Sequence, residues 1–404
     1  MEKKATDLRQ PASIWRLASR ITALFVASAI ILTWIFAPPT IEQGMNQVAP
    51  HTPYNISKAA EKLHQQLVIG DLHADSLLWN RDITKRHNYG HVDLPRLREG
   101  NVAIQTFAAV TKSPRGQNYS RNDSDAIDNI TLLAFAQAWP VTTWTSLYQR
   151  AVYQAEKLEK IEQAHPDELN IIRYQQDLKE TLKNRAGGSQ QVAGLLAIEG
   201  AHALEGDLDK LQKLYDAGYR MIGLHHFFDN HLGGSLHGVS GSRLSLFGRR
   251  ALAKMEEMEL IVDLAHSSES VVDEVLKLAT RPVVISHTGL LGTCDSPRNI
   301  SDHLIKRVAD KGGLIGIGFW DAICDITPEG IVKTLRYAID LAGEDHIALG
   351  SDFDGSTRVS IDASELAVLT DLMIKQGFTE TEIRKVMGGN LQAFLLKQLP
   401  KNHF

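Results

Sequence analysis

Residues 67–75, with the sequence LVIGDLHAD, decide how the rest of this chain is interpreted. Three apolar residues, 67–69, are followed at once by Asp71, His73 and Asp75. A short apolar run of this kind is typical of a buried parallel strand, whose C-terminal end points polar side chains into the site that the fold builds there. In an extended strand His73 and Asp75 face the same way, and an imidazole beside a carboxylate can hold a divalent cation. His-x-Asp triplets also occur by chance, so the other ligands must come from elsewhere in the chain.

Seven further apolar runs follow the first strand, which we predict at 67–73. They are 102–110, 192–198, 221–225, 260–265, 282–286, 314–319 and 347–351. Amphipathic helical patterns separate many of them, namely 207–217, 244–258, 268–279, 301–311 and 328–342. Alternating strands and helices predict parallel pairing, and eight strands predict a closed (β/α)8 TIM barrel. An open doubly wound sheet is the alternative, but no Gly-rich phosphate turn follows the first strand.

The connection 111–191 is too long for a simple barrel loop. It holds helical patterns at 124–139, 144–164 and about 175–185. We therefore predict a helical insertion after the second strand, over the C-terminal rim where barrel enzymes build their pockets.

The N-terminal region departs from this globular pattern. Residues 21–37 (ITALFVASAIILTWIFA) carry no charge, and the basic segment 1–20 precedes them. Their length is at the short end for a membrane span and is longer than a usual signal-peptide core. The basic flank predicts a cytoplasmic tail, a transmembrane signal anchor at 21–37 and a main domain outside the cytoplasm, periplasmic or extracellular in a bacterium. A cleaved signal peptide is the alternative, although no A-x-A-like site is present.

A Pro-rich polar segment at 38–56 predicts a linker between the anchor and the main domain at 57–400. The chain has 404 residues, 43% hydrophobic and 23% charged, which suffices for one large globular domain. The net charge of −5 is spread along the chain without a basic block, which argues against nucleic acid as a partner.

Acidic and histidine side chains follow six of the eight predicted strands. Beyond the first strand they are Glu199, His225, His226, Asp263, His266, His287, Asp352 and Asp354. A barrel brings the C-terminal ends of all its strands to one rim, so these side chains should meet. Buried charges of one sign are costly unless a cation neutralises them, so the pattern predicts a metal site.

The chain offers five candidate ligands, which is more than the roughly three protein ligands that one catalytic zinc needs. His73, Asp75, Glu199, His266 and His287 fit two metals, and Glu199 is the natural bridge because a carboxylate has two oxygens. Imidazole-rich sites favour zinc over magnesium, with Mn, Co or Fe as alternatives. Two cations about 3.5–4 Å apart can share a water, lower its pKa and polarise the bond that it attacks.

Eight stretches resemble the membrane dipeptidase (renal dipeptidase) family, peptidase family M19, of the amidohydrolase-like metal-dependent hydrolases. They are GDLHAD at 70–75, HVDLPRLREGNVAIQTF at 91–107, LLAIEGAHAL at 195–204, SLFGRRALAKMEEMELIVDLAHSS at 245–268, RPVVISHTG at 281–289, CDSPRNISD at 294–302, LGSDFDG at 349–355 and MGGNLQAFL at 387–395. In this order they cover about residues 60–396.

The resemblance implies a dizinc hydrolase of dipeptides, both L,L and L,D, in which a metal-bridging hydroxide attacks the peptide bond. One zinc would be held by His73 and Asp75 and the other by His266 and His287, with Glu199 as the bridge. It leaves the oligomeric state open, with a homodimer as one alternative.

Three more roles follow from the resemblance. His226 would stabilise the developing oxyanion, Arg298 would bind the free carboxylate of the dipeptide, and Asp352 would move the proton between water and leaving amine. For Asp263 and Asp354 we expect structural roles behind the ligands.

Two other functions stay open at this point. A related barrel could act on a lactam, a lactone or an N-acyl amino acid, but its commonest versions have His where this chain has Asp75 and Lys where it has Glu199. A non-catalytic metal-stabilised binding protein would be expected to lack a ligand or a proton-transfer group, and none is missing.

Two details complete the expectations. We expect His231 and His237, in the loop after His226, to be solvated, with a place in the site as the alternative. Cys294 and Cys324 follow the sixth and seventh predicted strands on neighbouring loops, where an oxidising compartment would allow a disulfide and a reducing one would leave free thiols. The resemblance favours the disulfide, since similar positions are paired in secreted relatives.

Overall fold

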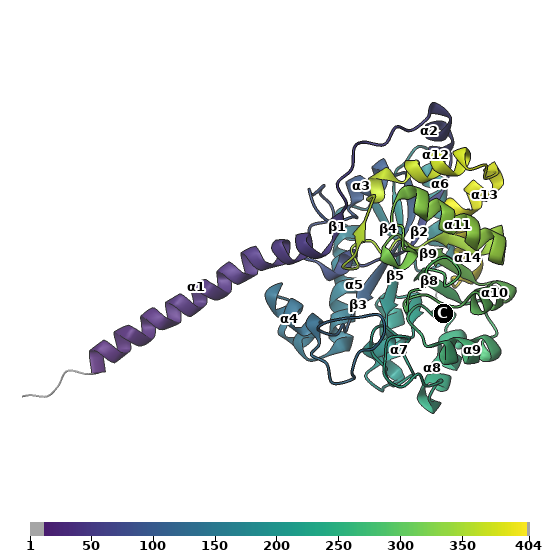
Figure 1. Cartoon of the computed structure of the whole chain (residues 1–404). Helices are drawn as coiled ribbons and strands as arrows, with labels where there is room; N and C mark the ends of the chain where they lie inside the picture. Colours follow the sequence, from purple (N-terminus) through teal and green to yellow (C-terminus); the bar gives the residue numbers. More distant parts are fainter. Residues whose placement is uncertain (1–11, 402–404) are drawn as a thin grey trace, which may run out of the picture.

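A closed barrel of eight parallel strands forms the centre of the computed structural model, which describes residues 12–401 (Figure 1). Around the barrel the order is β3–β2–β10–β9–β8–β7–β6–β5, and β3 closes it by pairing with β5 over seven residues. The strands are β2 (Ile69–Ala74), β3 (Val102–Val110), β5 (Val192–Glu199), β6 (Met221–Gly223), β7 (Ile261–Asp263), β8 (Val284–Thr288), β9 (Leu314–Ile317) and β10 (Ile347–Leu349). Each lies in a predicted apolar run or overlaps one, and every residue in them is buried. The predicted (β/α)8 fold is confirmed.

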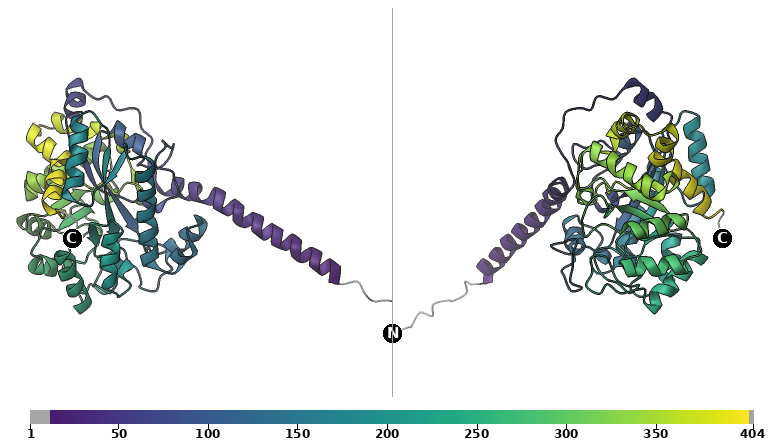
Figure 2. Two further views of the ribbon diagram at one scale, coloured as in Figure 1. Left: turned by 180° about the vertical axis from the view of Figure 1, so that it is seen from behind. Right: turned by 45° about the vertical axis from the view of Figure 1, so that its right-hand side comes forward.

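Helices surround the barrel, as the two further views show (Figure 2). Those outside the insertion and the N-terminal region are α2 (Lys58–His64), α3 (Leu94–Glu99), α7 (Asp209–Asp216), α8 (Leu246–Glu257), α9 (Glu269–Leu278), α10 (Asp302–Asp310), α11 (Pro328–Ala342), α12 (Ala367–Lys375), α13 (Glu380–Arg384) and α14 (Asn390–Gln398). Several begin at the expected capping residues. The side chains of Ser245, Ser268 and Thr327 each accept a hydrogen bond from the backbone N–H three residues further on.

The insertion after the second barrel strand contains three helices, as predicted: α4 (Asn129–Ala136), α5 (Leu147–Ala164) and α6 (Gln175–Ala186). Only its first part lies near the site. The helix α5 packs against β3, and α6 packs against β5 and α14, so both lie on the outside of the barrel. A short strand that the sequence does not predict, β4 (Leu169–Ile171), pairs with the start of β5. Three residues are too few to show a strand period.

The N-terminal helix α1 (Ala12–Met45) is longer than the predicted span at 21–37. It is the one helix among residues 12–401 that is long and apolar enough to cross a membrane, and it projects from the barrel (Figure 1). It continues through Pro38 and Pro39, so the first residues of the predicted 38–56 linker are helical. Most of the predicted basic tail lies outside the described residues.

Contacts with the barrel explain why α1 continues past its prolines. Glu42 is buried and pairs with Arg81. After the helix, the Oδ1 of Asn46 accepts a hydrogen bond from the backbone N–H of Ser356 over 2.8 Å. The strand β1 (Gln47–Val48) then pairs in parallel with β11 (Arg358–Val359). The N-terminal helix is therefore joined to the loop after β10.

A disulfide joins Cys294 to Cys324, which confirms the pairing favoured by the resemblance. It connects the loop after β8 with the loop after β9.

Candidate active site

Seven predicted site residues converge at the C-terminal end of the barrel, and all are buried. His73 and His287 lie within β2 and β8, Glu199 ends β5, and Asp75 directly follows β2. The other three, His226, His266 and Asp352, each lie three residues beyond the end of their strand. His266 and Asp352 have left-handed backbones, with φ of 60° and 59°, a conformation that non-glycine residues adopt mainly where the surroundings enforce it.

Glu199 lies at the centre of this cluster. Its Oε1 is 3.0 Å from Nε2 of His266, 3.3 Å from Nε2 of His287 and 3.6 Å from Nε2 of His73. Its Oε2 is 3.4 Å from Nε2 of His226. One carboxylate therefore faces the ring nitrogens of four histidines that come from four different strands or the loops after them.

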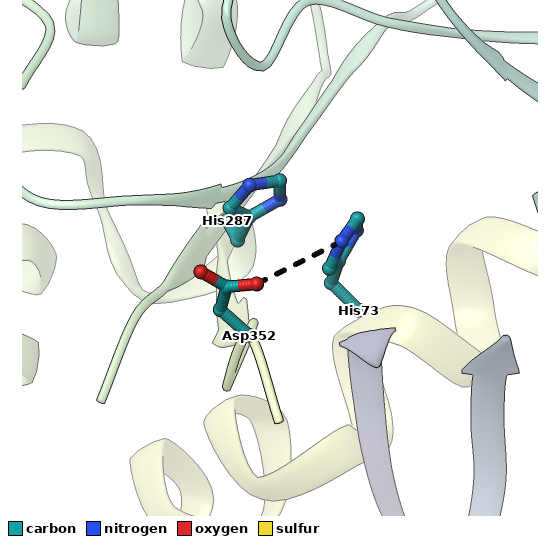
Figure 3. A group of neighbouring side chains, drawn as sticks. All are labelled: His73, His287 and Asp352. Carbon is teal, nitrogen blue, oxygen red and sulfur yellow. Dashed lines mark ion pairs between the residues drawn. The ribbon is translucent and has the colours of Figure 1, made fainter. Parts of the chain in front are cut away.

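A second carboxylate, that of Asp75, also lies beside His73. Its Oδ1 lies 3.3 Å from the Nε2 of His73. Asp352 is further away, with 4.0 Å between its Oδ1 and the same nitrogen, and it points toward His73 and His287 (Figure 3). Asp75, His73 and Asp352 thus form one side of the cluster.

The donor set fits metal ions. Within residues 12–401, Nε2 of His73, Oδ1 of Asp75 and Oε2 of Glu199 are buried and have no hydrogen-bond partner. Such atoms are rare in folded proteins unless a ligand or water satisfies them. Three groups of side chains bring one donor atom each within 4.8 Å of one another: His73 with Asp75 and Glu199; Glu199 with His226 and His266; and His73 with His287 and Asp352.

The electrostatics of the cluster agree with this fit. Burial raises the pKa of Asp352 to about 8, and burial together with the charge of Asp75 raises the pKa of Glu199. Burial lowers the pKa of His73, but the carboxylates of Asp75 and Glu199 outweigh it and raise that pKa to about 10. Ionising all the carboxyls of the site would therefore place more negative charge there than its histidines neutralise, and cations would relieve it.

Asp263 fixes His287 through a serine. The Ser286 hydroxyl donates to Oδ2 of Asp263 over 2.6 Å, so its oxygen can accept from Nδ1 of His287, 2.9 Å away. With its proton on Nδ1, His287 presents a bare Nε2 to Glu199. Backbone N–H groups of Ala265 and Ser286 hold the other oxygen of Asp263.

Asp354 has a purely structural environment. Its carboxylate accepts hydrogen bonds from Ser76, Arg81 and the backbone N–H of His91. These contacts join the loop after β10 to the loop after β2.

Arg298 lies on the His266 side of the site and is buried. Its Nη2 donates to the backbone oxygen of His287 over 3.0 Å and lies 3.2 Å from Nε2 of His266. Its guanidinium sits over the ring of Trp320, 5.3 Å from the centroid. The side chain is thereby held at the edge of the cluster.

His226 donates from Nδ1 to the backbone oxygen of Lys112 over 2.9 Å, because a carbonyl can only accept. Burial lowers the pKa of this histidine to about 4. In its neutral form the ring therefore presents a bare Nε2 to Glu199.

His237 is not solvated, contrary to the prediction. It is fully buried, its Nδ1 donates to the backbone oxygen of Tyr119 over 2.7 Å, and its ring lies 5.1 Å from that of His266. Asp229 organises this loop by accepting from the backbone N–H groups of Ser235, Val239 and Ser240. The Gly- and Ser-rich loop gave no sequence signal for such burial. His231, by contrast, is exposed as predicted.

A cavity of about 390 Å³ opens onto the cluster. Besides Asp75, Glu199, His226, His266, Arg298 and Asp352, it is lined by Tyr119 and Trp320, which the sequence did not suggest. Apolar side chains form another part of its lining: Ile41 and Met45 of α1, and Ile130, Leu132, Leu133 and Ala136 of α4. The end of α1 is thus part of the wall of the cavity.

The sequence model of the membrane dipeptidase family (peptidase family M19) matches residues 57–399. The chain belongs to the membrane dipeptidase family. This confirms the resemblance drawn from the motifs, and membership makes the protein a hydrolase of the dipeptidase type.

Two relatives and one solved structure are similar to this chain. An uncharacterized dipeptidase of Schizosaccharomyces pombe is 26% identical over 324 residues, 77% of this chain and 74% of the relative. The dipeptidase tcpJ of Claviceps purpurea is 26% identical over 317 residues, 75% of this chain and 68% of the relative. The crystal structure of a Rhodobacter sphaeroides metallopeptidase, bound to a phosphinate mimic of the dipeptide L-Ala-D-Ala, has a TM-score of 0.66 at 24% identity and covers 82% of this chain and 99% of its own. The last likeness concerns the fold.

Proposed function

We propose that this membrane dipeptidase family member is a dizinc enzyme that hydrolyses dipeptides. One observation carries the proposal: the carboxylate of Glu199 lies between His73, which is beside Asp75, and the pair His266 and His287. His73 and Asp75 would hold one zinc, His266 and His287 the other, and Glu199 both. When bound, two such cations supply an activated water and polarise the bond under attack.

Arg298 would bind the free carboxylate of the substrate. It lines the cavity beside the proposed ligands, and a guanidinium fork matches a carboxylate with two parallel hydrogen bonds. Its contact with the backbone of His287 leaves further N–H groups for the substrate. The enzyme would therefore select substrates with a free C-terminus.

Asp352 would carry the proton from the attacking water to the leaving amine. Burial raises its pKa to about 8, which brings a carboxyl into the range where it can both accept and return a proton near neutral pH. It lines the same cavity as Arg298 and lies next to His73.

His226 would stabilise the negative charge that develops on the carbonyl oxygen. Because its Nδ1 already donates to Lys112, a donor at Nε2 requires the doubly protonated ring. The Glu199 carboxylate at 3.4 Å favours that charged form, whereas burial opposes it. The role therefore depends on how much negative charge faces Nε2 during the reaction.

Both L,L and L,D dipeptides are proposed as substrates. The Rhodobacter sphaeroides relative was crystallised with a mimic of L-Ala-D-Ala, which supports the L,D class within this fold.

We also propose that α1 is retained as an anchor and that the barrel lies outside the cytoplasm. The disulfide supports an oxidising compartment, and the basic residues before the apolar segment support a cytoplasmic N-terminus. Protease treatment of cells from which any outer envelope has been removed, with the cytoplasmic membrane intact, should degrade the barrel and spare an N-terminal tag. A barrel that resists protease until the cells are lysed would overturn this orientation.

The activity is tested with the full chain in detergent, stripped of metal by a chelator and then titrated with Zn²⁺. Cleavage of Ala- and Gly-containing dipeptides should return as two equivalents bind, and C-terminally amidated dipeptides should remain intact. Metal-dependent cleavage of lactams or N-acyl amino acids, without cleavage of any dipeptide in a varied panel, would replace this function with the related amidohydrolase-like one.

A further inference from the structure

The start of the insertion presents an apolar surface beside α1. Residues 129–144, which include α4, contain no charged residue. Three large apolar side chains in this segment are exposed, Leu132 by 52%, Phe135 by 40% and Val141 by 69%, and we call them the α4 patch. Leu132 and Phe135 are three residues apart and so share one face of the helix. The 3-10 turn that begins at Val141 packs against α4.

The α4 patch lies at the level of the last apolar turns of α1. The indole N–H of Trp34 donates to the backbone oxygen of Phe135 over 2.9 Å, and the two rings meet edge to face at 6.4 Å. Trp34 stands three residues before the end of the uncharged segment 21–37. Figures 1 and 2 show α4 beside the part of α1 nearest the barrel.

A bilayer that covers the end of the uncharged segment must therefore reach α4. Around Trp34, the side chains of Ile31, Ile35 and Phe36 are 52%, 57% and 63% exposed, so residues 12–401 leave more than half of each uncovered. Tryptophan is enriched where a membrane meets water, and Trp34 has that position in the segment. Since Phe135 contacts Trp34 directly, a layer of lipid around one includes the other.

We propose that α4 is a second membrane contact, in which Leu132, Phe135 and Val141 enter the interface between headgroups and acyl chains of the bilayer that α1 spans. This contact rests on the proposed retention of α1 as an anchor and is independent of the catalytic proposal. Burying exposed apolar area in lipid is favourable, and it would fix the orientation of the barrel as well as its attachment.

The orientation matters because the cavity shares residues with this surface. Leu132 belongs to the α4 patch and also lines the cavity, together with Ile41 and Met45 of α1. With α4 in the interface, this wall of the cavity would stand at the surface of the bilayer. Substrates that partition to the membrane surface would then be concentrated at the site.

A site-specific fluorescent probe tests the contact in the full chain. The only two cysteines form the disulfide, so a new cysteine is the only free thiol. Val141→Cys and Leu132→Cys would be labelled with the environment-sensitive dye NBD and reconstituted into vesicles of phosphatidylcholine and phosphatidylglycerol. Two references accompany them: Leu24→Cys, within the apolar segment, and Leu246→Cys, on α8 and 78% exposed.

At positions 141 and 132 we expect emission at shorter wavelength than at 246, with quenching by lipids that carry a nitroxide near the headgroup. If the probe at 24 is quenched by lipid and the probes at 141 and 132 behave like that at 246, α4 does not touch the bilayer. If the probe at 24 is not quenched either, the proposal that α1 spans the bilayer is contradicted. A blue shift at 141 without lipid quenching, together with crosslinking between copies of the unlabelled Val141→Cys variant through its new thiol, would replace the bilayer with a second copy as occupant.

Discussion

Glu42 and Arg81 form an ion pair that is buried against the barrel, with 2.6 Å between Oε1 and Nε. The same guanidinium donates from Nη2 to Asp354 over 2.6 Å, two residues after the proposed proton carrier Asp352. One arginine therefore connects the N-terminal helix α1 to the loop that carries Asp352 and Asp354.

The substitution Glu42→Gln should lower the free energy of unfolding. Leaving a buried charge without a partner costs about 3–5 kcal/mol, and the loss here should fall below that range because Arg81 keeps Asp354 as a partner and glutamine can still accept a hydrogen bond. Urea denaturation in detergent would measure it. The control Glu380→Gln breaks an exposed pair with Arg384 and should change stability by less than about 1 kcal/mol. Equal effects of the two substitutions would show that the α1 contact contributes nothing.

Asp263→Asn should weaken metal binding without removing a ligand. An amide nitrogen cannot accept from Ser286, so the serine would no longer hold the proton of His287 on Nδ1. Substitutions of residues that orient metal ligands through hydrogen bonds typically lower metal affinity or activity by about 10- to 100-fold. Competition with a chromogenic chelator would measure the affinity. Asp340→Asn, at an exposed position of α11, serves as the control and should leave the metal affinity unchanged.

Arg298→Lys should raise KM for dipeptides more than it lowers kcat. Lysine keeps the charge but loses the planar fork, and we expect about a 10- to 100-fold change. Amidated dipeptides provide the decisive comparison. The wild type should strongly prefer the free acid, and the variant should lose much of that preference. If the preference is unchanged, Arg298 does not bind the carboxylate.

The double variant Cys294→Ser, Cys324→Ser should be less stable by about 3–4 kcal/mol, since the disulfide closes a loop with a sequence separation of 30. Each half-cystine lies four residues from a cavity residue, Arg298 or Trp320, so KM should rise as well. Denaturation of the wild type with and without a reductant gives the same comparison without mutation. An unchanged unfolding midpoint in reductant that has demonstrably opened the bond would contradict the expectation.

The stability of the protein should rise with pH between about 7 and 10 because of Lys157. Burial lowers the pKa of this lysine to about 7, and its ammonium group donates to the backbone oxygens of Leu77 and Trp79. Between the folded pKa and the unfolded value of 10.5, the unfolded chain binds more protons, so the free energy of unfolding increases with pH. Below pH 7 both states are protonated and this contribution is constant.

The difference between wild type and Lys157→Met isolates that contribution when urea titrations are run at pH 7, 8 and 9. As the pH rises, the free energy of unfolding should increase more for the wild type than for the variant. Lys160→Met, at an exposed position of the same helix, should show no such trend. A pH-independent difference at position 157 would mean that the buried lysine titrates normally.

Prediction from sequence succeeds where one segment contains both the apolar run of a strand and the polar residues of the site. In β2 the apolar run locates the strand and the next polar residues locate the site, so His73 and Asp75 are found together with their fold. The same holds for Glu199 and His287. Parallel strands then bring these residues to one rim without any further information.

Prediction fails where partners distant in the chain decide the local structure. Pro38 and Pro39 predict the end of a helix, yet α1 continues to Met45, where Glu42 meets Arg81 and the following Asn46 meets Ser356. His237 lies in a loop with every sign of solvation, but contacts with Tyr119 and the ring of His266 bury it. Neither the continued helix nor the buried histidine is indicated by the residues of its own segment.

The pairing of β1 with β11 has a consequence for biosynthesis. Gln47 lies opposite Arg358, so all the strands β2–β10 are synthesised between the segment that docks α1 and its partner. This wall of the cavity can close only after the ribosome has produced the whole barrel. A nascent chain that carries α1 but not yet β11 therefore lacks this wall of the cavity, so the site is complete only once β1 and β11 have been made and paired.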